Sequence, residues 1–247
     1  MSYEKFAYIY DYLMTDTPYA EWMNFLAATM AEFSCEGDQV LELACGTGEL
    51  SVLLSAGGYE VTGVDLSEDM LMMAREKAEA KGVPIAFYQQ DMSTLEGLGM
   101  FDAAVLFCDS LNYLSGPDQV LSTFKRVHDH LKSGGLFLFD VHSTYKVDKL
   151  FIDHTFALDD EKVSYIWNSF AGEEPHSVEH ELSFFVRSPD GRYDRFEECH
   201  YQRTYITRDI EQWLLEAGFE VLKITADFTG QPPGSESERI FFACRKR

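Results

Sequence analysis

Apolar positions along the chain recur with two periods, and each period predicts a different kind of element. Before residue 37 they follow a helical spacing in two stripes separated by Pro18, which predicts two short helices. From residue 40 onwards, short apolar runs alternate with amphipathic stretches. This alternation is typical of parallel strands joined by right-handed helical crossovers, which place helices on both faces of a sheet. The expected strands cover residues 40–43, 60–64, 85–88, 101–107, 136–141, 219–224 and 240–244.

The pattern changes again within residues 143–206. Apolar and polar residues alternate strictly around Val163–Trp167 and Val178–Val186, which is the period of a strand with one buried face. Clusters of acidic residues, Gly and Pro lie between these runs and mark turns. We therefore expect an antiparallel sheet of three or four strands inserted into one α/β domain. The predicted fold is a Rossmann-like, doubly wound, mostly parallel seven-stranded sheet with an inserted antiparallel β subdomain.

This organisation divides the chain into three parts. Residues 37–142 and 207–247 form the main domain, residues 1–36 form N-terminal helices, and residues 143–206 form the insert. In an open α/β sheet, ligands bind at the carboxyl ends of the strands. Because the insert begins at that edge, we expect it either to cover a substrate or to contact a second subunit in a homodimer. The N-terminal helices are expected to form another part of the active-site cover.

Composition narrows the class of protein. The formal net charge of −22 disfavours nucleic-acid binding, because an acidic surface repels phosphate backbones. No run of about 18 apolar residues occurs, so we expect no transmembrane helix, and the N-terminus lacks the pattern of a secretory signal. The five cysteines are widely spaced, which favours reduced thiols in a cytoplasmic protein over disulfides or a zinc site. The excess of acidic residues is compatible with a neutral or cationic substrate.

Residues with useful chemistry follow three successive strands. The first strand runs into Ala44-Cys45-Gly46-Thr47-Gly48, whose small residues allow a sharp turn and let a ligand approach the backbone. Asp65 ends the second strand, where a carboxylate can accept hydrogen bonds from both hydroxyls of a ribose. Asp91 follows the third strand and can accept from an adenine amino group, with Met92 and Leu66 flanking the base. Together these positions predict a site for an adenosyl group.

The same motifs closely resemble the class I S-adenosylmethionine-dependent methyltransferases over nearly all of the α/β domain. The first motif of that family is acidic-x-Gly-x-Gly-x-Gly, and it is matched by Glu42, Ala44, Gly46 and Gly48. Ala44 replaces the first glycine, a modest departure that still leaves room for the turn. The resemblance implies that S-adenosylmethionine is the cofactor, that S-adenosylhomocysteine is the product, and that no metal takes part.

A second stretch extends this resemblance to the place where the methyl group would lie. Residues 101–110 are similar to the fourth motif of the family, whose end is implied to lie beside the methionine and the transferred methyl. The resemblance, with the strand-end positions above, gives an expected set of cofactor-binding residues: Glu42, Ala44, Cys45, Gly46, Gly48, Asp65, Leu66, Met70, Asp91, Met92, Phe107, Cys108 and Asp109.

The acceptor is less well specified by the sequence than the cofactor. An insertion after the fifth strand resembles the small-molecule branch of the family, which includes amine and sugar N-methyltransferases, so we expect a small-molecule acceptor, with an amine as one candidate. A neutral amine needs little base assistance, whereas a hydroxyl needs a general base. His142 directly follows the fifth strand and is the leading candidate base, with Tyr10 and Asn112 as further catalytic candidates. Further candidates on loops that we expect over the strand ends are Tyr12, Tyr19, Asp109, Tyr113 and His200. A structural role is the alternative for each of these residues.

Other functions fit parts of the pattern. A nicotinamide dehydrogenase is disfavoured because Ser51 stands where its third glycine would fall. A non-catalytic protein that binds S-adenosylmethionine or its product would carry the same motifs. A methyltransferase that acts on protein or RNA is a further alternative, although the acidic charge counts against RNA. The sequence identifies neither the acceptor nor its nucleophilic atom.

Overall fold

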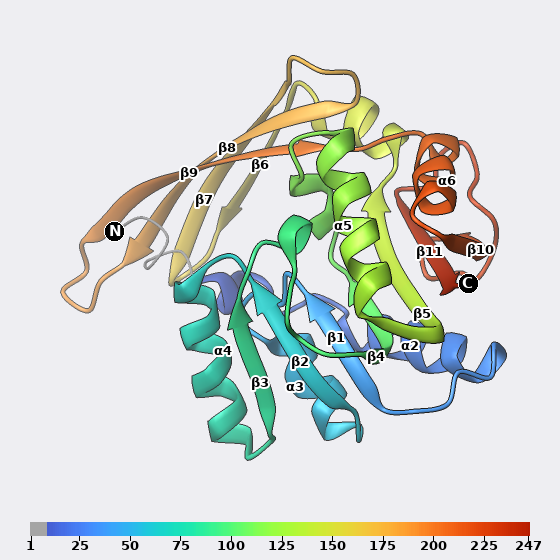
Figure 1. Ribbon diagram of the computed structural model, residues 1–247. Helices are drawn as coiled ribbons and strands as arrows, with labels where there is room; N and C mark the ends of the chain where they lie inside the picture. Colours follow the sequence, from blue (N-terminus) through green and yellow to red (C-terminus); the bar gives the residue numbers. More distant parts are fainter. Residues whose placement is uncertain (1–8) are drawn as a thin grey trace.

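The computed structural model describes residues 9–247, and a seven-stranded sheet lies at its centre (Figure 1). The strands of this sheet are β1 (Gln39–Leu43), β2 (Glu60–Asp65), β3 (Ile85–Gln89), β4 (Phe101–Leu106), β5 (Leu131–His142), β10 (Phe219–Ala226) and β11 (Arg239–Lys246). They lie in the order β10-β11-β5-β4-β1-β2-β3. Neighbours among β1 to β5 pair in parallel, whereas β11 is antiparallel to both β5 and β10. The expected mostly parallel sheet is confirmed.

Helices cover both faces of the sheet. They are α2 (Tyr19–Glu32), α3 (Glu49–Ala56), α4 (Glu68–Lys81), α5 (Pro117–His130) and α6 (Thr207–Glu216). Phe124 of α5 and Leu214 of α6 belong to one apolar layer, while Leu26 of α2 and Leu54 of α3 belong to the other. The doubly wound arrangement follows from these two layers. None of the helices in the described part of the chain is both long and apolar enough to cross a membrane.

The N-terminal segment is helical before α2, as the apolar spacing predicts. Residues 9–13 form a short helical turn, which ends before Pro18. The first part of the expected N-terminal helices, residues 1–8, lies outside the described residues. Trp22, Leu26 and Met30 of α2 are buried against the sheet, which accounts for the second apolar stripe.

Short irregular elements follow three of the parallel strands. The 3₁₀ helix η1 (Met92–Thr94) comes after β3, the 3₁₀ helix η2 (Ser110–Tyr113) comes after β4, and the π-helix η3 (Lys146–Phe151) comes after β5. All three therefore begin at the carboxyl ends of parallel strands. Because regular elements occupy the rest of the sheet, loops that could form a site gather at this one edge.

The fifth strand is longer than the sequence pattern predicts. It begins at Leu131, which pairs with Phe101, whereas the expected strand begins at Leu136, which pairs with Ala103. The register shifts between these two pairs, and Ser133 and the following glycine are exposed between them. The residues between these two pairs thus form a local bulge inside the strand, and the apolar pattern alone predicts only the part of the strand that follows the bulge.

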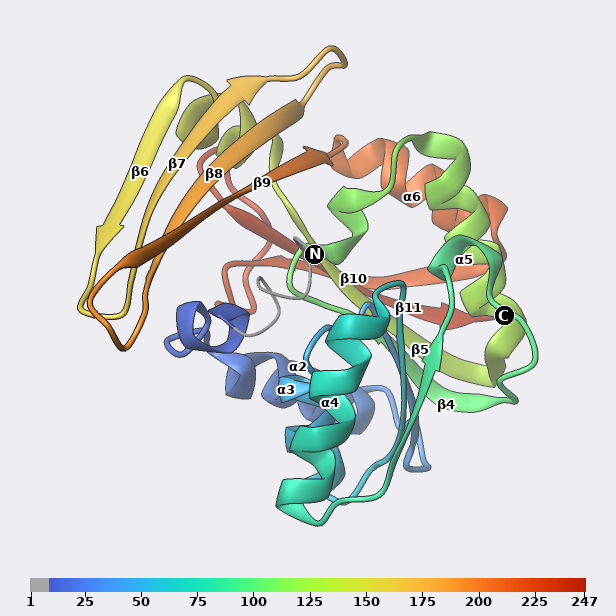
Figure 2. The ribbon, with the colours of Figure 1, turned by 90° about the vertical axis from the view of Figure 1, so that its left-hand side faces the viewer.

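The insert is a separate antiparallel sheet of four strands. Its strands are β6 (His154–Asp159), β7 (Val163–Ala171), β8 (Ser177–Arg187) and β9 (Tyr193–Arg203), paired in chain order. One end of the sheet packs on Ile9 through Val163 and Phe184, and the other end packs on η3 through Val178. Figure 2 shows the four strands standing over the edge of the main sheet. This confirms the antiparallel sheet expected from the alternating pattern.

Candidate active site

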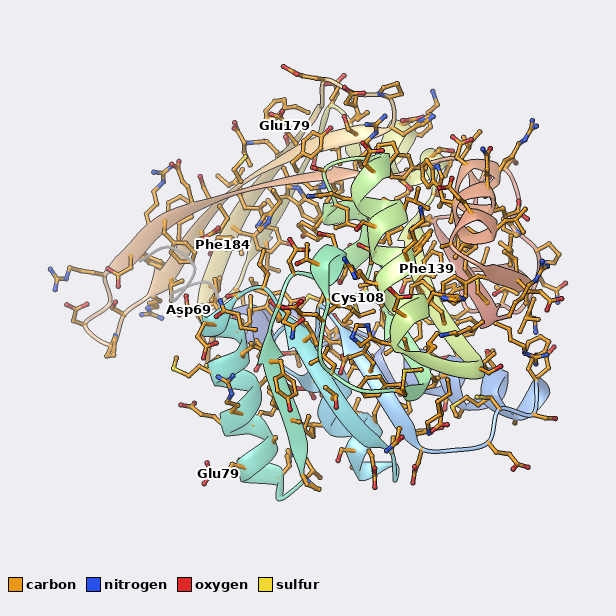
Figure 3. The ribbon with its side chains drawn as sticks, in the orientation of Figure 1. Asp69, Glu79, Cys108, Phe139, Glu179 and Phe184 are labelled. Atoms are coloured by element: carbon orange, nitrogen blue, oxygen red, sulfur yellow. The ribbon has the colours of Figure 1, made fainter. Side chains whose placement is uncertain are left out.

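A cavity lies where the insert faces the carboxyl ends of the main sheet. Its volume is about 830 Å³, which is within the range of pockets that enclose a small ligand. The wall combines segments that are far apart in the sequence: Tyr10, Ala44, Gly46, Asp65–Met70, Gln90–Met92, Ser110, Tyr113, Leu114, Gln119 and Cys199–Tyr201. Figure 3 labels Asp69 at the end of α4 that meets this region and Phe184 in the insert sheet. The cavity therefore joins the main domain, the N-terminal segment and the insert.

The turn after β1 has the backbone shape that its small residues predict. Ala44, Gly46 and Gly48 all have positive φ angles, of 51°, 54° and 75°. A Cβ at Gly48 would lie 2.8 Å from the Cβ of Ala74, so this glycine permits close packing against α4. A Cβ at Gly46 would meet nothing within 4 Å. Since Gly46 lines the cavity, this space is open to a ligand that lies against the backbone.

Asp65 ties this turn to the next one. Its Oδ2 accepts a hydrogen bond from the backbone N–H of Gly46 at 2.8 Å, and its Oδ1 accepts one from the N–H of Ser67 at 2.9 Å. Burial raises the pKa of Asp65, and the backbone hydrogen bonds partly oppose that rise. Each carboxylate oxygen can accept a second hydrogen bond. Asp65 can therefore shape the turn and still accept from two ligand hydroxyls.

The third strand end adds an acid and two apolar side chains. Asp91 accepts hydrogen bonds at its Oδ1 from the N–H and the hydroxyl of Ser93, both at 2.7 Å. Leu66 also lines the cavity and is 66% exposed, which is unusual for a leucine in a folded protein. Met92 is partly buried and lines the same wall. These groups offer two apolar surfaces beside a hydrogen-bond acceptor, which suits a flat heteroaromatic base.

Another part of the wall is aromatic. Tyr10, Tyr113, His200 and Tyr201 come from the N-terminal segment, η2 and β9. The rings of Tyr113 and His200 meet edge to face, with centroids 6.0 Å apart. Burial lowers the pKa of His200, an effect that the nearby Glu198 carboxylate opposes, so the imidazole is neutral at pH 7. Burial likewise holds the pKa of Tyr10 well above its ordinary value. This half of the cavity is therefore aromatic and uncharged.

Charged residues of one sign line the cavity. Its acidic residues are Asp65, Glu68, Asp69 and Asp91, and its lining within residues 9–247 includes no Lys or Arg. A cavity with this lining attracts cations and repels anions such as phosphates and carboxylates. Across the same residues, no group of three His, Cys, Asp or Glu side chains is arranged to hold a metal ion.

Several expected site residues lie behind the wall instead of on it. Glu42 is only 4% exposed and accepts a hydrogen bond from the hydroxyl of Ser51. Burial raises the pKa of Glu42 to about 8, so at pH 7 its carboxyl group is largely protonated. The expected cofactor-binding residues outside the cavity lining are Glu42, Cys45, Gly48, Phe107, Cys108 and Asp109. Figure 3 labels Cys108, which follows β4 at the edge where the cavity lies.

A buried ionic network supports the turn after β4. Asp140 accepts hydrogen bonds from the backbone amides of Cys108 and Asp109, each at 3.0 Å, and from the indole N–H of Trp22 at 2.8 Å. Arg239 pairs with both Asp140 and Asp109, the latter at 2.9 Å. Arg239 holds both carboxylates, and Asp140 in turn binds the two amides, so the network fixes the backbone at residues 108 and 109.

His142 and Asn112 take part in a neighbouring network and do not line the cavity. The Nε2 of His142 lies 3.1 Å from Asp109 and donates to it, since a carboxylate only accepts. Asn112 accepts from the N–H of His142 and donates to the carbonyl of Arg203, both at 2.9 Å. Burial raises the pKa of Asp109, but the charges and hydrogen bonds of His142 and Arg239 outweigh it and hold this pKa well below its ordinary value. Of the three catalytic candidates, only Tyr10 lines the cavity.

Other lining residues were not predicted from the sequence. Leu114, Gln119 and Cys199 carry no motif that marks them as site residues. Glu68 and Asp69 come directly after Ser67, whose side chain accepts a hydrogen bond from the N–H of Met70 and begins α4. A helix that starts at a strand end was therefore a signal that could have indicated these two acids.

Comparison with known proteins gives methyltransferases at the level of the family model, of whole-chain relatives and of solved structures. Residues 40–135 match a family model described as a methyltransferase domain. Over 247 residues the chain is 52% identical to a protein of Geobacillus sp. (strain WCH70) provisionally named a methyltransferase, with 100% of both chains covered. The structure of an S-adenosylmethionine-dependent methyltransferase from Clostridium acetobutylicum ATCC 824 matches with a TM-score of 0.90 and 35% identity, covering 99% of this chain and 98% of that one. A sugar N-methyltransferase from Streptoalloteichus sp. ATCC 53650 shares the fold, with a TM-score of 0.79, 21% identity, and 97% and 92% of the two chains covered.

Proposed function

The chain belongs to the class I S-adenosylmethionine-dependent methyltransferases, and from this premise we propose that it methylates a neutral or cationic small molecule, with an amine as the favoured acceptor. The observation that carries the proposal is the lining of the cavity. The cavity has acidic residues and an aromatic wall, and its lining includes no Lys or Arg among the described residues. This lining suits a neutral or cationic acceptor and disfavours an anionic one. The fold shared with a sugar N-methyltransferase is compatible with this choice.

The residues around the turn after β1 fit the adenosyl part of the cofactor. We assign Asp65 to the ribose hydroxyls and Asp91 to the adenine amino group, with Leu66 and Met92 on the two sides of the base. The open space at Gly46 would receive the methionine part against the backbone. Met70 completes this side of the cavity. Phe107, Cys108 and Asp109 would then stand behind the methyl group, with the amides of Cys108 and Asp109 bound by Asp140.

The protein's task in the reaction is to position the acceptor and to take up a proton. S-adenosylmethionine, when bound, supplies a methyl group on a positively charged sulfonium, which is a good leaving group. Tyr10, Tyr113 and Tyr201 offer aromatic surfaces that keep a neutral amine in line with the methyl and stabilise, by cation–π contact, the positive charge that develops on its nitrogen. His200 is neutral at pH 7 and lines the same cavity, so it accepts the proton that the acceptor nitrogen releases when its new N–C bond forms.

His142 and Asn112 have a different role in this proposal. Their hydrogen bonds join the end of β5 to η2, to Asp109 and to β9, so they position the acceptor wall without touching the acceptor. The role of the insert as a cover follows from the three β9 residues in the lining. Its role as a homodimer contact and a cytoplasmic location both stay predictions.

Two measurements test the proposed function. Calorimetry with the full-length protein should detect binding of S-adenosylmethionine and of S-adenosylhomocysteine. A panel of small acceptors should then be assayed for release of S-adenosylhomocysteine, with each amine matched to an analogue that carries a carboxylate. We expect turnover with members of the amine set and none with the matched anions. Turnover with anions alone would refute the assigned acceptor class, and binding without any turnover would favour a non-catalytic cofactor-binding protein.

A further inference from the structure

Three consecutive residues of the N-terminal turn contact three separate parts of the molecule. Tyr10 lines the cavity. Asp11 accepts a hydrogen bond at Oδ1 from the hydroxyl of Thr47 at 2.5 Å, and its Oδ2 lies 2.7 Å from the Nζ of Lys77. Tyr12 donates its hydroxyl to Asp160, at the turn between β6 and β7, at 2.6 Å. A single turn of the chain thus joins the cavity, the glycine-rich loop with α4, and the insert.

The contact between Asp11 and Thr47 lies one residue away from the cavity on both sides. Asp11 follows Tyr10, and Thr47 follows Gly46, and both Tyr10 and Gly46 line the cavity. Gly46 is in turn held by Asp65, through the hydrogen bond to its backbone N–H. Two hydrogen bonds and two steps along the backbone therefore connect the carboxylate of Asp65 to Tyr10.

The charges around Asp11 make this contact specific. Lys77 also pairs with Glu49, the first residue of α3, at 2.8 Å, so one ammonium serves two carboxylates. The side chain of Lys77 is 16% exposed and that of Asp11 is 33% exposed, so the pair is partly shielded from solvent. Thr47 is almost fully buried, at 2% exposure, and its hydroxyl has Asp11 as its acceptor. Removal of the carboxylate would leave a buried hydroxyl without that acceptor and Lys77 with one counter-charge fewer.

From this geometry we propose that Asp11 is a positioning residue, which couples the cofactor loop to the acceptor wall by fixing Tyr10 over the cavity. The inference rests on the proposed function, because it takes the glycine-rich loop as the cofactor side and Tyr10 as the acceptor side. A ligand that orders Gly46 and Thr47 orders Asp11 and Tyr10 as well. Cofactor binding therefore prepares the acceptor wall, and loss of Asp11 separates the two events.

The first test follows this coupling without any acceptor. Hydrogen–deuterium exchange of the full-length protein should slow in residues 9–14 and 44–48 when S-adenosylhomocysteine binds. In the Asp11→Ala variant, binding should still slow exchange in residues 44–48 but no longer in residues 9–14. Asp16→Asn is the matched control, because Asp16 is an exposed acid in the same segment. Equal protection of residues 9–14 in Asp11→Ala and in the wild type would overturn the proposal.

A kinetic test with an amine substrate separates positioning from a general loss of structure. Asp11→Ala should raise the KM for the acceptor and lower kcat, about tenfold in kcat/KM, while the KM for S-adenosylmethionine changes less than threefold. Asp11→Ala added to Tyr10→Ala should cause no further loss, because Asp11 acts through Tyr10. Additive losses in the double variant would refute the coupling. If no amine is methylated, the exchange experiment still decides on Asp11, so failure of the proposed function and failure of this inference are distinguishable.

Discussion

The substitution Asp65→Ala tests the cofactor site most directly, because one side chain carries two of its contacts. The carboxylate already accepts from the amides of Gly46 and Ser67, at 2.8 and 2.9 Å. Two ribose hydroxyls would add one hydrogen bond to each oxygen. A charge-assisted hydrogen bond contributes about 1.5–3 kcal/mol, but water would solvate the freed hydroxyls in an open cavity, so we expect a net loss of about 1–3 kcal/mol. This corresponds to roughly 5- to 150-fold weaker binding.

Isothermal calorimetry with S-adenosylhomocysteine measures this loss without depending on the acceptor. Asp69→Asn is the matched control, since it removes one negative charge from the same cavity wall but leaves the hydrogen bonds of Asp65 to Gly46 and Ser67 in place. We expect less than a twofold change for this control. Denaturant titration is needed beside the calorimetry, because Asp65→Ala also frees two backbone amides and should lower the free energy of unfolding by about 1–2 kcal/mol. Unchanged affinity in a folded Asp65→Ala protein, or an equal loss in Asp69→Asn, would refute the ribose assignment.

Three further predictions concern the glycine-rich loop and two titrating groups. Gly48→Ala should lower the free energy of unfolding by about 2–4 kcal/mol, because a Cβ at this positive φ is strained and clashes with Ala74. Gly46→Ala should lower it by only about 1–2 kcal/mol, but should weaken cofactor binding more than Gly48→Ala does. Denaturation measures the first effect and calorimetry the second. His200→Gln should abolish the acidic limb of the profile of kcat/KM against pH, because protonation of His200 below its lowered pKa removes the base. An unchanged acidic limb would exclude His200 as that base. Burial raises the folded-state pKa of Glu42 to about 8, so the contribution of Glu42 to stability is complete below its ordinary pKa and is lost as the pH rises towards and through 8. The urea midpoint of the wild type should therefore fall between pH 5.5 and 8.5, and Glu42→Gln should flatten this fall. Parallel curves of midpoint against pH for the two proteins would contradict the prediction.

The part of the cavity that we propose for the cofactor could be predicted, because its assembly depends on local pattern and on one rule of topology. The apolar runs locate the strand ends, and parallel strands place those ends at one edge. Asp65 and Asp91 stand immediately after two such runs, and the structure places both in one cavity with Gly46. Nothing in this reasoning needs a contact between residues that are distant in the sequence, apart from the pairing of neighbouring strands.

The acceptor half could not be predicted in the same way, because it depends on the path of the insert. His200 lies in β9, where the sequence shows no strict apolar alternation, and no local pattern tells which part of the main domain this strand meets. The structure places His200 beside Tyr113, which lies 87 residues earlier in the sequence. The N-terminal contact between Asp11 and Thr47 is likewise set by how the first turn packs, and no local motif indicates it.

His142 shows why a residue's position at a strand end does not by itself define its chemistry. It has the residue type and the place along the chain of a general base, directly after the last parallel strand. The structure nevertheless directs its Nε2 to Asp109, and Asp109 is bound in turn by Arg239, which comes from β11. Since Arg239 and Asp109 are 130 residues apart, the partner that decides the role of His142 is invisible to a local analysis. The imidazole of His142 is buried and held by an ionic network, whereas the imidazole of His200 lines the cavity. This difference in environment, not a difference in residue type, is why we propose His200 and not His142 as the proton acceptor.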